Sequence, residues 1–355
     1  MLGRSLLLLS GLLLLLTVLA VSATADPDPP QIDGGNVTFV GEWVVDPGDH
    51  LTYVNQTIVL DGNLTVSPTG SLDLVNCTIW LNLTPSGGSE LSGIRVGTLG
   101  TLNLTTGSLV IARSFAFFRA DIDAHLLIDN STVAHIGGVY SIGNSGLYTQ
   151  ADDTIIRRST ILGGNYGLIL DGVNGSVVED TVFTGISRKG LFIRGNATAL
   201  TLHNLSIDFK LEAIHIQDCR DVVVSNITVN RSGGITLMNG TVSLRNASFF
   251  DILGQAFTYV TSGSVQWIVD GGSWVINSTL QVNGPIDVLD GGKLNVINST
   301  LEVDNPDAHG VNGIRVRSGG EMSVTGDSTV SSVAGGYNYL WHVDAGGLLT
   351  LDGAT

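Results

Sequence analysis

The sequence contains little lysine and few charged residues of any kind. Only three of its 355 residues are lysine, and there are 32 acidic side chains against 16 basic ones, a formal net charge of −16. Binding a nucleic acid backbone requires clustered Lys and Arg, so nucleic acid is excluded as a partner. Charged residues make up 14% of the chain and apolar residues 43%. This apolar content is too high for a disordered chain and predicts a folded core.

Motifs of the common enzyme classes are missing. The sequence has no His-Glu-x-x-His, no Gly-x-Ser-x-Gly, no Cys-x-x-Cys and no glycine-rich loop that ends in Lys-Ser or Lys-Thr. Metal sites and hydrolase triads of these types are therefore not expected.

Long apolar runs occur only once, at the N-terminus. Arg4 precedes the apolar residues 6–21, and Ala23-Thr24-Ala25 provides a small-x-small cleavage site. Residues 1–25 are therefore predicted to be a secretory signal peptide. The alternative is an uncleaved anchor, but the apolar run is shorter than the ~20 residues of a spanning helix. No transmembrane anchor is predicted after the signal peptide, and residues 26–50 are interpreted as a linker and N-terminal cap.

Asn-x-Ser/Thr sequons are dense, since 16 of the 23 asparagines begin one. This density is typical of a glycosylated protein outside the cell. It also fits stacked Asn and Thr side chains that form ladders along repeated turns, and both interpretations stay open. The candidate glycosylation sites are Asn36, Asn55, Asn63, Asn76, Asn82, Asn103, Asn130, Asn174, Asn196, Asn204, Asn226, Asn230, Asn239, Asn246, Asn277 and Asn298.

A short repeat recurs between residues 160 and 262, in copies 23, 23, 21 and 22 residues apart. Each copy alternates apolar positions with period two, which predicts strands, and the spacing leaves no room for long helices. We therefore predict an all-β solenoid of about 12 turns and roughly 20–29 residues per turn over residues 51–355. The copies are Gly167-Leu168-Ile169-Leu170-Asp171, Gly190-Leu191-Phe192-Ile193-Arg194, Ala213-Ile214-His215-Ile216-Gln217, Gly234-Ile235-Thr236-Leu237-Met238 and Ala256-Phe257-Thr258-Tyr259-Val260.

A larger unit is duplicated. Asn76 and residues 93–104 match Asn298 and residues 313–324, at offsets of 222 and 220 residues. When the same offset is applied further along, the end of the chain falls within a turn, and the matching turn in the first copy is followed by more sequence. We therefore expect a truncated C-terminus, because a solenoid normally ends in a cap over its last apolar layer.

With these repeats the sequence resembles the right-handed parallel β-helix proteins, in particular the NosD-like and carbohydrate-binding/sugar-hydrolase (CASH) group and the repeat-rich surface proteins of archaea. The resemblance implies a right-handed parallel β-helix. It says less about activity, since lyases, hydrolases, adhesins and inert fibres share this fold. The NosD likeness also implies a role in copper-site maturation, which seven scattered histidines and three methionines disfavour.

The repeats predict a buried ladder of apolar side chains. Cys77 and Cys219 lie about six turns apart, and at ~4.8 Å per turn they are too distant for a disulfide, which needs Cα atoms within ~7 Å. The two predicted columns are Leu168, Leu191, Ile214, Ile235 and Phe257, and Leu170, Ile193, Ile216, Leu237 and Tyr259.

Outward positions on the same strands carry the best candidates for catalysis. Asp171, Arg194 and His215 fall on successive turns, and a carboxylate, a guanidinium and an imidazole on one face suit an acidic sugar and proton transfer. The alternative is a charge ladder in which Asp171 pairs with Arg194. The column that holds His215 also contains Ile169 and Phe192, which disfavours catalysis.

Other features are weaker candidates. The dense mixed-charge cluster at 152–153 and 157–158 is either a site or a solvated corner. No cofactor is predicted, although Asp121, Asp123, Asp26 and Asp28 are calcium-type ligands without an ordered 12-residue loop. Polar inserts at 85–92 and 304–312 are where a recognition surface is expected. Candidate sugar-stacking aromatics, or a core or cap layer, are Tyr140, Tyr148, Tyr166, Tyr337, Tyr339 and Trp341.

These observations favour an exported, N-glycosylated β-helix protein, secreted or at the cell surface, with a structural or adhesive role. Polysaccharides or other cell-surface components are the expected partners. The alternative hypothesis is a polysaccharide lyase or glycoside hydrolase that acts from an outward strand face.

Overall fold

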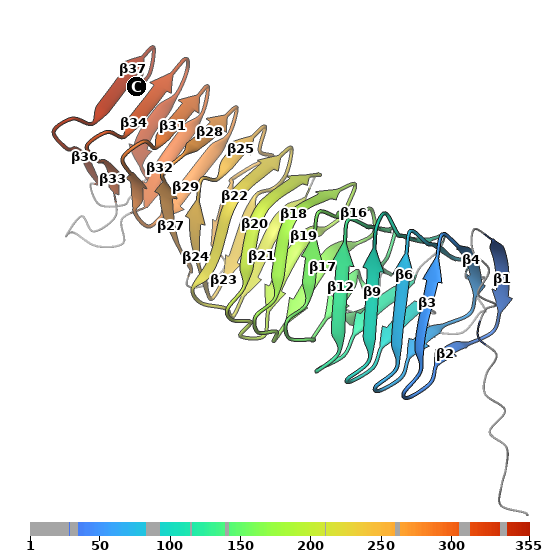
Figure 1. Cartoon of the computed structure of the whole chain (residues 1–355). Coiled ribbons are helices and arrows are strands. Elements are labelled where there is room, and N and C mark those ends of the chain that lie inside the picture. The colour runs from blue at the N-terminus through green and yellow to red at the C-terminus, as the bar shows by residue number, and fades with distance from the viewer. Residues whose placement is uncertain are drawn as a thin grey trace, which may run out of the picture.

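The computed structural model describes residue 28 and residues 35–82, 93–113, 116–138, 142–209, 211–259, 263–304, 313–333 and 339–355. These residues form a rod of parallel strands that winds in about 12 turns between its two ends, which confirms the predicted solenoid (Figure 1). The helical element in these ranges is the 3-10 turn η1 (Ile142–Asn144). None of the helical structure in this part of the chain is long and apolar enough to cross a membrane.

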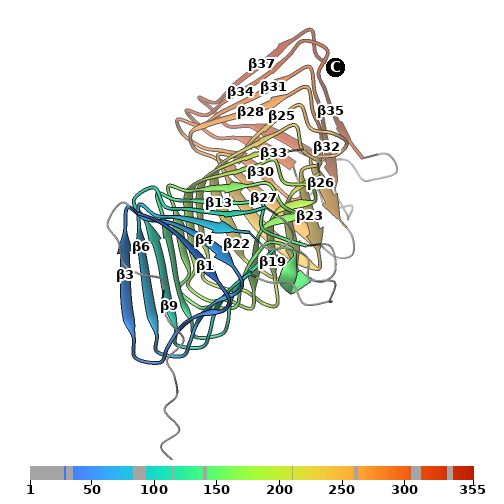
Figure 2. The same ribbon diagram turned by 90° about the vertical axis from the view of Figure 1, so that its right-hand side faces the viewer.

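Each turn contributes strands to three sides of the rod, here called faces 1, 2 and 3, and the view along the rod shows the resulting triangular coils (Figure 2). Faces 1 and 2 belong to one 24-stranded sheet that bends at the corner between them. Face 3 is a 10-stranded sheet followed by a three-stranded one, joined by a bridge between Gln255 and Thr279. Successive strands of a face come from successive turns, so they share one hydrogen-bonding direction along the axis.

The strand bounds are grouped by face. Face 1 holds β3 (His50–Val54), β6 (Ser71–Val75), β9 (Thr101–Thr105), β12 (His125–Asp129), β15 (Ile155–Arg157), β24 (Gly240–Arg245), β27 (Gly263–Val269), β30 (Ile286–Val288), β33 (Gly313–Val316) and β36 (Leu340–Val343). Face 2 holds β1 (Asn36–Val40), β4 (Thr57–Asp61), β7 (Thr78–Leu81), β10 (Leu109–Ala112), β13 (Thr132–Ala134), β16 (Thr160–Leu162), β25 (Ser248–Phe250), β28 (Gly272–Ile276), β31 (Lys293–Ile297), β34 (Glu321–Thr325) and β37 (Leu348–Asp352). Three long strands span both faces, β18 (Val177–Thr184), β20 (Thr201–Asp208) and β22 (Val222–Asn230). Face 3 holds β2 (Trp43–Val45), β5 (Leu64–Val66), β8 (Gly93–Val96), β11 (Phe117–Ala120), β14 (Leu147–Thr149), β17 (Tyr166–Asp171), β19 (Lys189–Arg194), β21 (Glu212–Gln217), β23 (Ile235–Met238), β26 (Phe257–Tyr259), β29 (Thr279–Asn283), β32 (Thr300–Asp304) and β35 (Thr329–Ser332).

The core is one continuous apolar ladder inside the rod. Leu168 pairs with Leu191, Leu191 with Ile214, and the column continues through Ile235 to Phe257, as the repeat predicts. All five side chains are fully buried. Because inward positions of the strands are apolar turn after turn, each added turn extends the same ladder.

Both cysteines lie in this interior. Cys77 and Cys219 are buried and free, which confirms that they do not pair. Burial raises the pKa of both thiols, as expected for structural rather than reactive cysteines.

At the corner between faces 1 and 2, a left-handed residue is followed by a small buried one. Asn130 has a φ of 47°, and Ser131 after it is 4% exposed. The amide of Ser131 donates to the hydroxyl of Ser159 in the next turn, at 3.1 Å. The buried hydroxyl thus satisfies a backbone group that the bend removes from the regular ladder.

The duplicated sequence unit does not return to the same side of the rod. Residues of β7 on face 2 correspond to those of β32 on face 3, and β8 on face 3 corresponds to β33 on face 1. The second copy is therefore displaced by one face relative to the first.

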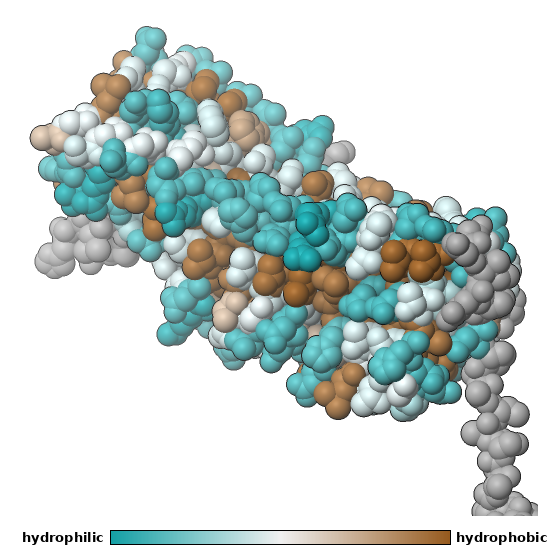
Figure 3. All heavy atoms as spheres, viewed as in Figure 1, coloured by the Kyte–Doolittle hydropathy of each residue, from teal (hydrophilic) through white to brown (hydrophobic). Residues whose placement is uncertain are grey.

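Both ends of the described chain carry strands of the same coil. Strand β1 pairs with β4, so the strands begin within the segment that the sequence assigns to a linker and cap. At the other end, Tyr339 and Trp341 are partly buried against the core, as expected for a core or cap layer. On the side seen in Figure 3, the surface is mostly hydrophilic, and hydrophobic residues gather in patches that include one near mid-rod.

Candidate functional site

The candidate residues lie on the outer side of face 3, on strands β14, β17, β19 and β21. Tyr148 pairs with Ile169, Ile169 with Phe192, and Phe192 with His215. Ile169, Phe192 and His215 form the outward column that the repeat predicts, and Tyr148 extends it by one turn.

That column is buried although it points outward. Ile169 is 0% exposed, Phe192 3% and His215 8%. The rings of Tyr166 and Phe192 stack with centroids 6.1 Å apart, and both pack with Tyr148 and Ile169 in a second hydrophobic cluster outside the sheet. Large side chains on turns about 4.8 Å apart cover one another, which strand alternation alone does not reveal. Tyr148 and Tyr166 therefore do not form exposed platforms for a sugar ring.

Asp171 connects three successive turns. Its carboxylate accepts a 2.7 Å hydrogen bond from the Tyr148 hydroxyl and lies 3.3 Å from Nε of Arg194. Burial and the hydrogen bond to Asp171 raise the pKa of Tyr148. The ion pair that the sequence offers as the alternative to catalysis is thus present.

His215 belongs to a separate cluster with Lys189 and Glu212. Its Nδ1 lies 2.5 Å from the Lys189 ammonium and 3.0 Å from the Glu212 carboxylate, and Lys189 also forms an ion pair with Glu212. A neutral Nδ1 accepts from the lysine, and a protonated one donates to the carboxylate. Burial opposes the charge on Glu212, but hydrogen bonds from His215 and Lys189 outweigh it and lower its pKa to about 2. Burial lowers the pKa of Lys189.

Cationic groups are frequent on this face of an acidic chain. Arg188 is exposed, lies over the Tyr166 ring with Cζ 5.8 Å from its centroid, and pairs with no carboxylate among the described residues. Arg119 donates 2.7 Å to Asp121, which also binds Arg95 at 2.7 Å.

The calcium-type carboxylates do not converge. Asp121 is held by its two arginines, and Asp28 accepts a 3.1 Å hydrogen bond from the indole of Trp43. Asp26 lies outside the described residues. Within the described ranges, no three His, Cys, Asp or Glu side chains are grouped to hold a metal ion. The described carboxylates therefore do not assemble a calcium site.

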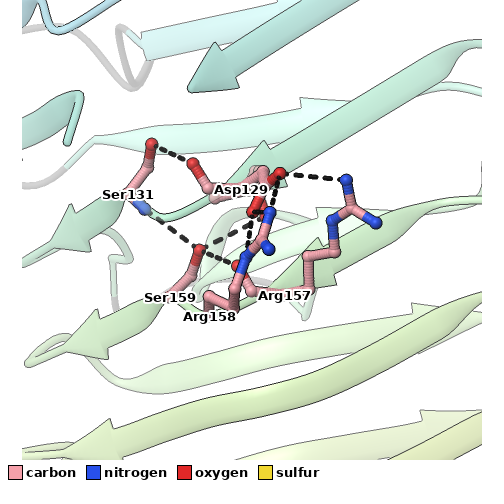
Figure 4. A network of polar contacts seen from close by, with 6 residues as sticks. Asp129, Ser131, Arg157, Arg158 and Ser159 are labelled. Atoms are coloured by element: carbon pink, nitrogen blue, oxygen red, sulfur yellow. Dashed lines mark hydrogen bonds and ion pairs between the residues drawn. The ribbon is translucent and has the colours of Figure 1, made fainter. Parts of the chain in front are cut away.

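The mixed-charge cluster around residues 152–158 forms a corner. Arg157 lies 3.0 Å from Asp129, and Arg158 lies 2.6 Å from the same carboxylate (Figure 4). Burial opposes the charge of Asp129, but bonds from the two arginines lower its pKa. Asp152 instead accepts a backbone hydrogen bond of 2.6 Å from Asn174. The cluster therefore links neighbouring turns and does not pair two carboxylates for hydrolysis.

A groove that the sequence did not indicate runs along the corner between faces 2 and 3. It has a volume of about 1000 Å³ and follows the ends of β18, β20, β22 and β25. Its walls come from corner segments of different lengths, which carry no motif.

The family model for a right-handed β-helix region matches residues 66–249 and 137–305, which together cover more than half of the chain. The chain belongs to the right-handed β-helix family. The family accounts for the observed coil, but it does not determine the chemistry of the site, because one fold hosts many activities.

No curated protein matches the chain. Among three matching solved chains is the crystal structure of a TibC-catalyzed hyper-glycosylated TibA fragment, with 14% identity and a TM-score of 0.30 over 90% of this chain and 96% of that one.

Several predicted features fall outside the described residues. They are the signal peptide, Tyr140, Tyr337, the insert at 85–92 and nearly all of the insert at 304–312.

Proposed function

We propose that this protein is a structural or adhesive β-helix rod that acts outside the cytoplasm. The observation that carries this proposal is that polar groups of the candidate site bind one another. Asp171 is held by Tyr148 and Arg194, and His215 contacts Lys189 and Glu212. A general base needs a lone pair that is free to take a proton from the substrate. These engaged side chains instead hold successive turns together.

The location is supported by the sequence. We propose that residues 1–25 are removed as a signal peptide and that part of the sequons carry N-linked glycans. The partners would be polysaccharides or other cell-surface components. The acidic exterior would repel nucleic acid.

Export and modification can be tested together by mass spectrometry of the protein recovered outside producing cells of its native host. We expect an N-terminus at Asp26 and a mass that falls after enzymatic removal of N-glycans. A chain that keeps residues 1–25 and remains in the cytoplasm would contradict the proposal.

The proposed role can be separated from catalysis by a polysaccharide screen. Neutral and acidic polymers are scored for retention, new reducing ends and unsaturated products, with Asp171→Ala and His215→Ala in parallel. We expect retention without cleavage, unchanged by either substitution. Cleavage that both substitutions abolish would place an active site on face 3 and overturn the structural role.

A polysaccharide lyase is the second candidate, and one observation favours it. The exposed Arg188 adjoins the Lys189, Glu212 and His215 cluster, so an acidic sugar could pair with the guanidinium near the partly buried amine of Lys189. If this candidate is correct, the screen will show unsaturated products from a polyuronate, and Arg188→Ala will raise KM.

A further inference from the structure

The sequon asparagines differ in whether their side-chain amides are bonded to a neighbouring turn. The Nδ2 of Asn204 donates to Asp180 at 2.6 Å, and that of Asn76 donates to Asn55 at 2.8 Å. The same bond to an aspartate one turn away, at 2.6 to 3.0 Å, is made by Asn103, Asn239 and Asn277. These five and Asn246 are called the bonded sequons below.

Asn246 shows the strongest form of this arrangement. Its Nδ2 lies 2.8 Å from a carboxylate oxygen of Asp270 and 3.3 Å from Oδ1 of Asn226. Its own Oδ1 accepts from the backbone amides of Asp270 at 3.0 Å and Gly271 at 2.9 Å. An amide offers two N–H donors and two lone pairs, so every polar position of this side chain is in use.

Three sequons have no such bonds. Their asparagines are exposed, and their side chains form no hydrogen bond with any residue that the structure describes. The threonine that completes each sequon is not buried. Asn230 is excluded from this group because its partner Ser232 is 0% exposed. The three free sequons are Asn36 with Thr38, Asn130 with Thr132, and Asn196 with Thr198.

This difference matters for the attachment of an N-linked glycan. The asparagine Nδ2 attacks the anomeric carbon of a phosphate-activated sugar, the bond from that carbon to the phosphate oxygen breaks, and one Nδ2 proton passes to the leaving phosphate. Nδ2 must therefore face the sugar donor, whereas in the bonded sequons it faces the adjacent turn. A sugar attached before folding would displace that bond, since turns ~4.8 Å apart leave no room for a ring between them.

We propose that the folded protein carries its N-linked glycans at Asn36, Asn130 and Asn196, and that the bonded sequons stay unmodified. This assignment rests on the proposed function and deepens it by naming the sites of modification. Asn196 follows Arg194 by two positions, so its glycan would stand at the edge of face 3, beside the ion pair of Arg194 with Asp171.

The first test is mass spectrometry of glycopeptides from the folded protein recovered outside cells of its native host. We expect glycans at the three free sequons and none at the bonded ones. Asn196 and Asn204 form a matched pair, since both are exposed and left-handed, with φ of 60° and 50°. If Asn204 is glycosylated as fully as Asn196, the assignment is wrong.

The second test removes the acceptor of one bonded sequon. Asp180→Gly keeps the left-handed backbone, whose φ is 48°, and frees the amide of Asn204. The glycosylated fraction of Asn204, measured relative to Asn196 in the same molecules, should rise about fivefold, the shift in population that one hydrogen bond accounts for. Asp221→Gly is the control, because Asp221 is also left-handed and exposed but bonds to no sequon asparagine in the described ranges. No rise in Asp180→Gly would show that the hydrogen bond does not protect Asn204.

Two further outcomes separate this assignment from the proposed function. If the protein is exported without residues 1–25 and no sequon carries a glycan, the assignment is wrong and the structural role stands. If the chain keeps residues 1–25 in the cytoplasm, the proposed export is wrong. The signal peptide of another exported glycoprotein of the host then replaces residues 1–25, and the ratio of Asn204 to Asn196 decides the assignment in the same way.

Discussion

At the scale of single residues, the left-handed asparagines explain much of the unusual sequence. Most of them are followed by a buried residue and then by Ser or Thr in a strand, so the corner geometry itself produces the sequon pattern. Asn tolerates positive φ better than most residues, and Thr is favoured in strands. Nine of the 16 sequons arise in this way, with φ between 47° and 54°, at Asn55, Asn76, Asn130, Asn204, Asn226, Asn239, Asn246, Asn277 and Asn298.

Asn226 allows a direct test of this explanation. Its φ of 51° is free of strain for glycine and unfavourable for a residue with a Cβ, so Asn226→Ala should lower the free energy of unfolding by about 1 kcal/mol, whereas Asn226→Gly should leave it nearly unchanged. Chemical denaturation of both variants provides the measurement. Equal losses in both would mean that the amide ladder, not the backbone angle, selects asparagine.

At the scale of strands, charged pairs on face 3 connect neighbours in the stack. Lys189 on β19 pairs in register with Glu212 on β21, and Asp171 on β17 pairs with Arg194 on β19. Such pairs add to the hydrogen bonds between the same strands. Both pairs are partly shielded from water, since Lys189 is 16% and Glu212 36% exposed, against 30% for Arg194 and 19% for Asp171.

The Lys189, Glu212 and His215 cluster predicts that stability depends on pH. The folded-state pKa of Glu212 is about 2, below its ordinary value of 4.5, so its contribution to stability is present above pH 4.5 and is lost as the pH falls toward 2. Thermal unfolding should therefore show Glu212→Gln less stable than wild type at neutral pH, with the gap closing across that window. Glu302→Gln on β32 serves as control. A gap that persists at pH 2 would assign the effect to packing.

The strand columns could be predicted from the sequence, but the details of the site could not. The period-two repeat placed Leu168, Leu191 and Ile214 in one inward column because turn length fixes register. It also paired Asp171 with Arg194. The direct contact between His215 and Lys189 was not predictable, since Lys189 reaches the imidazole through a flexible side chain. The corner groove depends on loop shapes that no short pattern encodes.

At the scale of the whole molecule, each turn contacts mainly its two neighbours. Stability in such a rod is nearly a sum over turns and their interfaces. A complete turn can therefore be removed if the flanking turns still match, whereas a partial turn shifts every inward side chain beyond the cut.

Deletion of residues 189–211 tests this property, because Lys189 and Glu212 are equivalent positions one turn apart. We expect a soluble protein with a β-sheet circular dichroism spectrum and cooperative unfolding. Deletion of residues 189–199, less than half a turn, should yield an aggregating or protease-sensitive chain. If both deletions behave alike, the turns are not independent units.

The displacement of the duplicated unit by one face bears on valency. Two copies of a binding surface reinforce each other only when geometry lets both engage at once. Because β8 lies on face 3 and its counterpart β33 on face 1, equivalent surfaces point in different directions. A flat surface can contact only one of them at a time. The rod is therefore better suited to bridging two surfaces than to binding a single surface through both copies.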